Sequence, residues 1–212
     1  MNILENYKVL LWDFDGVIMD SMPIRSKGFE VVLEQYPKEQ VEELLTFHKI
    51  NGGLSRYFKF RYFFEEIRKE PVTEDQVLAL ADDFSKIMLG LLMDEKLLIA
   101  DSVSFIKSNY QNYEMHIVSG SDGKELRQIN DALGLSPYFR TINGSPTPKK
   151  ELVANILEEY QYPRDEVILI GDSINDYEAA QFNQISFAGY NEESLKTISE
   201  NYIEQFNIKV SK

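Results

Sequence analysis

The chain has 212 residues, of which 43% are hydrophobic, enough to bury the core of one or two domains. Its formal net charge of −13 excludes broad polyanion binding, so we expect neither nucleic acid nor a membrane surface as a partner. The sequence has no cysteine, no signal-type N-terminus and no apolar run near the roughly 20 residues that cross a bilayer, so we expect a cytoplasmic protein. We also expect a monomer or weak homodimer.

Short apolar runs alternate with helical patterns along most of the chain. The runs predict buried parallel strands at 8–14, 114–119 and 166–171, and a weaker strand at 185–188. The helical patterns lie at 102–109, 123–133 and 149–160. This alternation predicts a doubly wound α/β sheet, whose ligands bind at the carboxyl ends of the strands.

Residues 21–95 break this alternation. The interval has helical periodicity with no strand pattern, the pair Gly52-Gly53 interrupts it, and Pro37 and Pro71 stand near expected helix starts. At about 10–14 residues per average helix, it has room for roughly four helices. We therefore predict a helical insertion at 21–95 over the active-site end of a core made of 1–20 and 96–212.

Two pairs of carboxylates follow predicted strands. Asp13 and Asp15 precede Gly16 after the first strand, and Asp172 and Asp176 follow the third. Acidic turn residues and helix N-caps are the alternative interpretations, with Asp172 or its neighbouring serine as the cap. Four carboxylates at one edge of a sheet would repel one another strongly without a cation, and their oxygens suit Mg²⁺. The convergence therefore predicts a magnesium site.

A serine and a lysine extend this pattern. Ser119 and Gly120 end the middle strand, where a hydroxyl and free backbone amides suit a phosphate group; an N-cap at Ser119 or Ser121 is the competing interpretation. Lys149 and Lys150 open a predicted helix, although the helix dipole disfavours a cation there. A nearby anionic group would explain a lysine in this position.

The ordered motifs resemble those of the haloacid dehalogenase superfamily. The resemblance rests on Asp13-x-Asp15-Gly, then a serine after a strand, then a lysine, then Gly-Asp172-x-x-x-Asp176, with a helical insertion after the first motif. It covers essentially the whole chain, and implies a Rossmann-like core with a helical cap. It also implies that Asp13 is the nucleophile, that Asp15 is the general acid and base, and that Mg²⁺ is held by Asp13, the backbone carbonyl of Asp15, and Asp172, with Asp176 supporting.

The same resemblance implies that Ser119 and the amide of Gly120 bind the phosphate. The family's lysine maps to Lys149, because 23 positions separate it from Asp172, and Lys150 is the alternative. The implied activity is that of a Mg²⁺-dependent phosphatase acting through an aspartyl phosphate. Its partner would be a small phosphorylated metabolite, such as a sugar phosphate or phosphoglycolate.

Two other functions stay open. A β-phosphoglucomutase-like activity fits Asp15 and the cap segment 53–56, but those mutases have a histidine where this chain has Arg25, which favours hydrolysis. The second is a catalytically silent binding protein on the same fold. Arg25, Arg56 and Lys59 are candidates for binding an anionic group of the substrate. For Arg56 and Lys59 we favour the ordinary alternative, a solvated basic stripe on a helix, and for Arg25 we likewise favour a solvated side chain.

Overall fold

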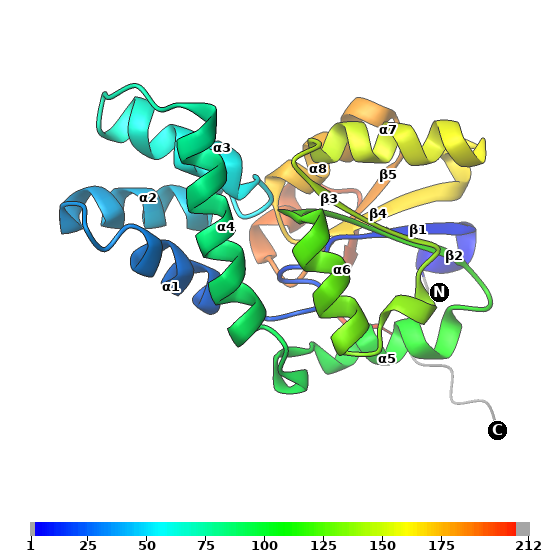
Figure 1. Cartoon of the computed structure of the whole chain (residues 1–212). Coiled ribbons are helices and arrows are strands. Elements are labelled where there is room, and N and C mark those ends of the chain that lie inside the picture. Colours follow the sequence, from blue (N-terminus) through cyan, green and yellow to red (C-terminus); the bar gives the residue numbers. More distant parts are fainter. Residues whose placement is uncertain (1–2, 207–212) are drawn as a thin grey trace.

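The protein is built around a parallel six-stranded sheet, which the computed structural model describes together with its helices over residues 3–206 (Figure 1). The strand order is β3-β2-β1-β4-β5-β6, so the chain winds outward in both directions from β1. The strands are β1 (Val9–Trp12), β2 (Glu114–Asp122), β3 (Thr141–Ser145), β4 (Val167–Gly171), β5 (Ser186–Tyr190) and β6 (Asn201–Ile203). The predicted doubly wound α/β fold is confirmed.

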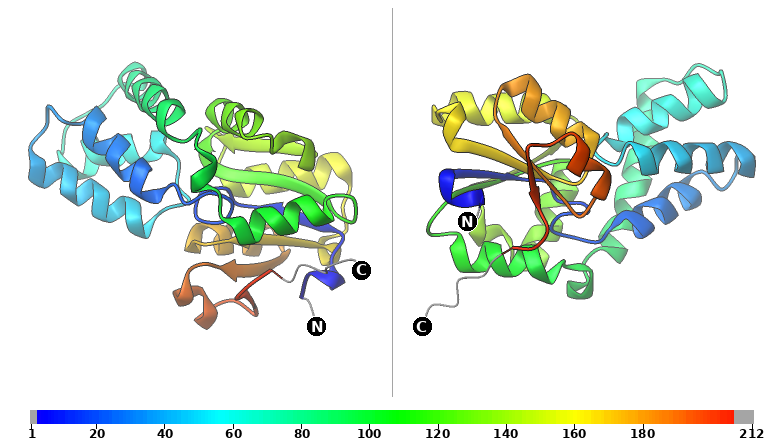
Figure 2. Two further views of the ribbon diagram at one scale, coloured as in Figure 1. Left: turned by 90° about the horizontal axis from the view of Figure 1, so that it is seen from below. Right: turned by 180° about the vertical axis from the view of Figure 1, so that it is seen from behind.

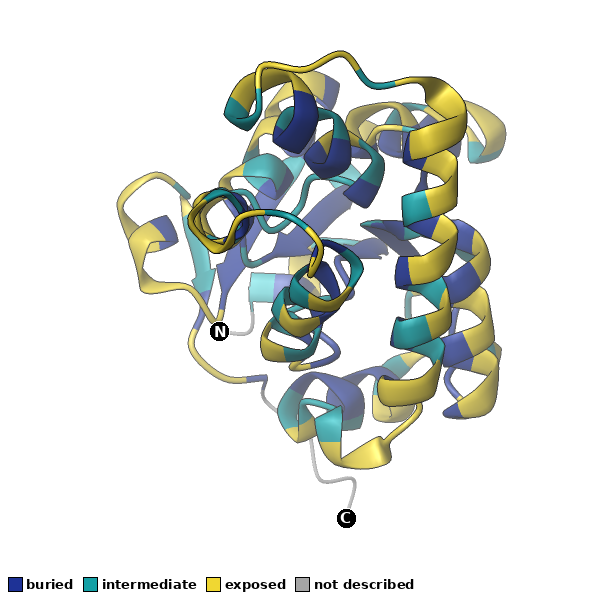
Figure 3. Ribbon diagram, turned by 60° about the vertical axis from the view of Figure 1, so that its left-hand side comes forward, coloured by how far each residue is buried: buried dark blue, intermediate teal, exposed yellow. Residues whose placement is uncertain are grey.

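Helices cover both faces of the sheet. These core helices are α5 (Ala100–Asn109), α6 (Gly123–Ala132), α7 (Lys149–Tyr160) and α8 (Ile174–Asn183). Side chains of β1 alternate between the faces: Leu10 packs in a cluster with residues of α5 and α6, whereas Leu11 packs with residues of α7 and α8. Figure 3 shows the result, since the central strands are buried and the outward faces of the helices are exposed. A strand covered on both faces needs a continuous apolar run, as in β1 and β4.

Four helices, which lie between β1 and α5 in the sequence, form a separate layer. They are α1 (Met22–Val32), α2 (Lys38–Ile50), α3 (Arg56–Tyr62) and α4 (Glu74–Leu91), and the π-helical turn η2 (Phe63–Ile67) extends α3. Figures 1 and 2 show this layer beyond the end of the sheet at which β1 stops. Phe29, Phe60 and Phe84 pack together inside it, with ring centroids 4.6–6.2 Å apart. The prediction of four helices in this interval is confirmed.

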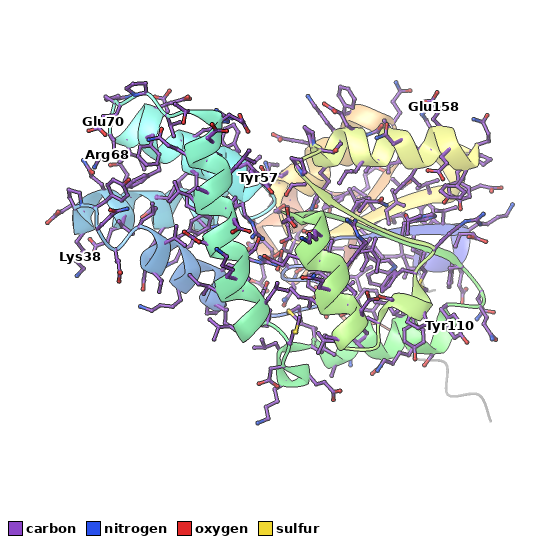
Figure 4. The ribbon with its side chains drawn as sticks, viewed as in Figure 1. Lys38, Tyr57, Arg68, Glu70, Tyr110 and Glu158 are labelled. Atoms are coloured by element: carbon purple, nitrogen blue, oxygen red, sulfur yellow. The ribbon has the colours of Figure 1, made fainter. Side chains whose placement is uncertain are left out.

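The helical layer touches the core through specific side chains. Tyr57 of α3, labelled in Figure 4, donates a hydrogen bond of 2.7 Å to Oδ2 of Asp122 at the end of β2. The backbone also meets directly: a Cβ on Gly120 would lie 2.1 Å from the carbonyl oxygen of Gly53. The absence of a side chain on Gly120 therefore lets the loop before α3 lie against the end of β2.

The sequence missed two strands and several single turns. β3 and β6 were not predicted, because their sequences TINGS and NYI contain polar or small residues and most of their positions are only half-buried. The turns are the 3-10 helices η1 (Ile3–Asn6), η3 (Glu95–Leu97), η4 (Ser136–Tyr138), η5 (Arg164–Glu166) and η6 (Glu193–Thr197). The predicted strands and core helices occur in the structure, with end positions that differ by at most three residues.

Candidate active site

Three carboxylates meet at the edge of the sheet between β1 and β4, where the strand order reverses. β1 and β4 are parallel neighbours with Trp12 beside Ile170, so Asp13 and Asp172 leave the sheet next to each other. Asp176 follows on the first turn of α8. One oxygen from each of Asp13, Asp172 and Asp176 lies within 4.8 Å of the other two. This is the switch point at which doubly wound sheets bind ligands.

The electrostatics of this cluster favour a cation. Burial and the charge of Asp176 raise the pKa of Asp13 to about 7, and burial together with the charge of Asp13 raises the pKa of Asp172. Gly16, at φ +76°, leaves room for Asp172, because a Cβ there would lie 1.8 Å from Oδ2 of that carboxylate. Buried oxygen donors that disfavour one another's charges fit a hard divalent ion such as Mg²⁺.

Lys149 is buried, and its positive charge faces the carboxylates of the cluster. Its Nζ lies 2.9 Å from Oδ1 of Asp13 and forms an ion pair with Asp176. Burial alone would lower the pKa of Lys149, but the charges of Asp13 and Asp176 together with their hydrogen bonds outweigh burial and raise that pKa. These two carboxylates explain a lysine at the start of α7. The alternative, Lys150, is exposed, with its Nζ 5.3 Å from the ring centre of Phe182.

Asp176 is itself held in place by Ser173. Oδ2 of Asp176 accepts hydrogen bonds from the backbone N–H of Ser173, at 3.1 Å, and from its hydroxyl, at 2.5 Å. Ser173 is also the N-cap of α8, as one interpretation of the sequence predicted. One oxygen of Asp176 thus caps the helix while the other faces Lys149.

The side chain of Asp15 lies outside the acidic cluster. Its carboxylate accepts from Nε of Arg25 at 2.5 Å, from the hydroxyl of Ser121 at 2.5 Å, and from the hydroxyl of Ser21. Asp15 thus lies at the same edge of the sheet, where its charge acts on Asp13 and Asp172, but a guanidinium from α1 holds its carboxylate apart from the other three. Burial would raise the pKa of Asp15, but the charge of Arg25 and the hydrogen bonds from Ser121, Ser21 and Arg25 together outweigh burial and lower it.

Ser119 and Gly120 lie inside β2, two and three residues beyond Ile117, which pairs with Trp12 of β1. β2 runs three residues further than predicted, so the N-cap of α6 is Asp122, whose carboxylate accepts from the N–H groups of Lys124 and Glu125. The competing interpretation of Ser119 as an N-cap is therefore wrong. Its hydroxyl accepts from the N–H of Ser121 at 3.1 Å. Ser121 was not assigned a role at the site; its spacing of two from Ser119 was the available signal.

Arg25, Arg56 and Lys59 are buried, so the interpretation of a solvated stripe is wrong. Arg56 is 4% exposed and Lys59 is 2% exposed. The two guanidinium groups share one carboxylate: Nη1 of Arg25 donates to Oε1 of Glu125 at 3.2 Å, and Nη1 of Arg56 lies 2.7 Å from Oε2. Nη1 of Arg56 also donates to Ser85 at 2.7 Å.

Glu125 and His48 were missed as partners of these cations. An acidic residue in the first turn of a helix is ordinary, so the sequence around Glu125 carried no signal. Nζ of Lys59 lies 2.9 Å from Nδ1 of His48 and donates to the carbonyl of Gly52 at 3.1 Å. Burial, more than any neighbouring charge, lowers the pKa of Lys59 to about 7.

A buried carboxylate beside a buried lysine, at the switch point of a doubly wound sheet, defines an α/β enzyme that acts on an anionic group. Residues 10–190 match the sequence model of the family described as "Haloacid dehalogenase-like hydrolase". The chain therefore belongs to that family, and it is a hydrolase of the phosphatase type.

Individual relatives agree with this assignment. The chain is 23% identical over 181 residues to a "Phosphorylated carbohydrates phosphatase" of Thermotoga maritima, covering 82% of this chain and 80% of that protein. It is 25% identical over 194 residues to a "Phosphoglycolate phosphatase" of Photobacterium profundum, covering 85% and 82%. Among solved structures, a β-phosphoglucomutase of Clostridium difficile has the same fold, with a TM-score of 0.75 at 16% identity over 95% of this chain and 92% of that one.

The helices were compared with the length and apolar character of a membrane-spanning segment. Within 3–206, none of the helices combines the length and the apolar character needed to span a bilayer.

Proposed function

We propose that this protein is a Mg²⁺-dependent phosphatase that hydrolyses a small phosphorylated metabolite through an aspartyl phosphate on Asp13. The observation that carries the proposal is the position of Asp13, buried, 2.9 Å from Lys149 and grouped with Asp172 and Asp176. The relatives that act on phosphorylated carbohydrates and on phosphoglycolate support a sugar phosphate or a phosphoglycolate-like substrate.

The proposed chemistry has two steps. A carboxylate oxygen of Asp13 attacks phosphorus in line, and the bond from phosphorus to the leaving oxygen breaks. Asp15 gives a proton to that oxygen, then takes one from the water that hydrolyses the aspartyl phosphate and releases inorganic phosphate. Lys149 offsets the repulsion between the carboxylate and the phosphate dianion. The hydroxyl of Ser119 and the amide of Gly120 donate hydrogen bonds to the phosphate oxygens.

The donor set at the sheet edge supports Mg²⁺ as the cofactor. Asp13, Asp172 and the backbone carbonyl of Asp15 would hold the ion, while Asp176 supports the site through its contact with Lys149. When bound, Mg²⁺ supplies positive charge that stabilises the phosphate in the transition state.

We propose residues 21–95 as a cap that determines which substrate is accepted, and 1–20 with 96–212 as the catalytic core. Arg25 and Arg56 come from the proposed cap and reach Asp15 and Glu125 of the core. One amino group of each arginine, Nη2, is buried with no hydrogen-bond partner among residues 3–206. These two groups are the donors that we propose for an anionic or hydroxyl group of the substrate.

A mutase remains the second candidate, because the solved mutase shares the fold and segment 53–56 resembles the substrate loop of mutases. Arg25 favours the hydrolase. Its guanidinium stays charged and keeps Asp15 in an ion pair before substrate binds, whereas a histidine can lose its charge near neutral pH. Product analysis separates the two: a hydrolase releases inorganic phosphate, and a mutase returns an isomeric phosphate ester.

The proposal is tested with an aryl phosphate and purified protein. We expect hydrolysis with Mg²⁺, its loss in EDTA, and its recovery when Mg²⁺ is added back. Asp13→Asn should abolish turnover without changing the circular dichroism spectrum. Asp165→Asn, in the turn before β4 and away from the acidic cluster, is the matched control and should keep full activity. Turnover in Asp13→Asn at the wild-type rate would exclude Asp13 as the nucleophile.

A further inference from the structure

Two cavities lie on either side of the contact between the loop before α3 and the end of β2. The loop at 52–54 and Gly120 line both of them. The cavity on the side of Asp15 and Arg25 has a volume of about 20 Å³, enough for about one water. The cavity on the side of α7 and α8 has a volume of about 390 Å³, which lies in the range of small-molecule sites. Of these two cavities, the larger one has room for an organic group.

One end of the larger cavity is lined by residues that we propose to act on the phosphate. Lys149 and Gly120 line it, and Nζ of Lys149 lies 2.9 Å from Oδ1 of Asp13, so the cavity is one side chain away from Asp13. Two polar atoms in its lining lack a hydrogen-bond partner among residues 3–206: Oγ of Ser145, a side chain that is 3% exposed, and Oδ1 of Asn175. Because buried polar groups are normally paired, both atoms are suited to a polar group of a ligand.

The outer walls of the same cavity are aromatic and apolar. Phe58 of α3 and Phe182 of α8 both line it, although they are 48% and 63% exposed. Pro146 and Pro148 contribute further apolar surface. Exposed phenylalanines are usually scattered, whereas these two come from the proposed cap and from the core and converge on one space. Aromatic walls of this kind bind a planar ring by stacking or edge-to-face contact.

We propose that this cavity is a subsite for an aromatic or heteroaromatic ring carried by the substrate's leaving group. The inference rests on the proposed function for the position of the phosphate, next to Asp13 and Lys149. It extends the substrate class from small phosphate esters in general to esters that carry a planar ring. The ring lies between Phe58 and Phe182, and its polar edge meets Ser145 and Asn175.

Binding of phosphonates tests the proposal without turnover, because their carbon–phosphorus bond is not hydrolysed by this chemistry. We would measure phenylphosphonate and methylphosphonate by isothermal titration calorimetry with Mg²⁺ present. The wild type should bind phenylphosphonate about tenfold more tightly than methylphosphonate, as expected for one aromatic contact with its buried area. The double variant Phe58→Ser/Phe182→Ser should lose this preference and bind both compounds with similar affinity.

The control is Ile50→Ser, which removes an exposed apolar side chain, 68% exposed, that does not line the cavity. It should keep the wild-type preference. Equal affinities in the wild type, no binding of phenylphosphonate, or a preference unchanged in the double variant would each overturn the ring subsite. Failure of the proposed function gives a different result, namely no phosphate release from any ester while the preference for phenylphosphonate persists.

Discussion

Arg25 approaches Asp15 from α1 at 2.5 Å, so the residue proposed as acid and base is held by an ion pair before substrate binds. The hydroxyl groups of Ser21 and Ser121 contact the same carboxylate. All three contacts stabilise the ionised form, which is the form needed to take a proton from water. To protonate the leaving group, Asp15 must first gain a proton. The rate of the first step should therefore depend on Asp15 most for esters whose leaving group needs a proton.

Asp15→Asn tests this division of roles. The variant should lose about 10²–10⁴-fold in rate on an alkyl phosphate, the usual contribution of general acid–base catalysis. In single-turnover measurements of the first step, an aryl phosphate with a very good leaving group should lose much less. Equal losses for both esters in that step would show that Asp15 does not protonate the leaving group.

Lys59 gives a prediction about stability and pH. Burial lowers its pKa from 10.5 to about 7, so between these two values the unfolded chain binds more protons than the folded one. Stability should therefore rise as pH increases from 7 towards 10, by up to about 1.4 kcal/mol per pH unit for one such group. In Lys59→Met, which keeps the apolar stem, urea unfolding at pH 7.5 and 9.5 should show a smaller rise. The same rise in both proteins would contradict the shifted pKa.

At the scale of elements, the contact between the loop before α3 and the end of β2 is set by backbone. Gly120→Ala would place a Cβ 2.1 Å from the carbonyl of Gly53, so the loop must move away from the core. We expect slower hydrolysis and faster amide hydrogen exchange at 51–55, with little change in exchange within the strands. Gly90→Ala is the control, because nothing lies within 4 Å of its Cβ and it should stabilise α4 by about 0.5–1 kcal/mol. Unchanged exchange at 51–55 in Gly120→Ala would contradict this role.

Elements also show how far the sequence predicts this protein. β1 and β4 were predictable, because strands buried on both faces require the continuous apolar runs VLLW and VILIG. β3 was not, since its half-buried sequence TINGS has no such run. At the site, the grouping of Asp13 with Asp172 follows from adjacent parallel strands. The pairing of Glu125 with Arg25 and Arg56 depends on how the helical layer docks on α6, and no local pattern contains that information.

For the molecule as a whole, the position of Asp172 gives a prediction about stability, because burial and the charge of Asp13 disfavour its ionised form. Asp13, Asp172 and Asp176 are held within 4.8 Å of one another in the folded chain only, so Mg²⁺ should bind the folded state far better than the unfolded one. At 100 times its Kd, an ion that binds only the folded state adds about 2.7 kcal/mol to the free energy of unfolding. The Tm should therefore rise with Mg²⁺ but not with NaCl at the same ionic strength.

Asp172→Asn separates this effect from a general effect of salt. The variant should lose the rise in Tm with Mg²⁺, and in EDTA it should be at least as stable as the wild type, because it removes one of the charges that repel. Asp82→Asn, on the exposed face of α4, is the control and should keep the wild-type response. A rise of equal size in Asp172→Asn would place the bound ion elsewhere. A loss of stability in EDTA would mean that Asp172 stabilises the fold even without an ion, which contradicts a cluster dominated by repulsion.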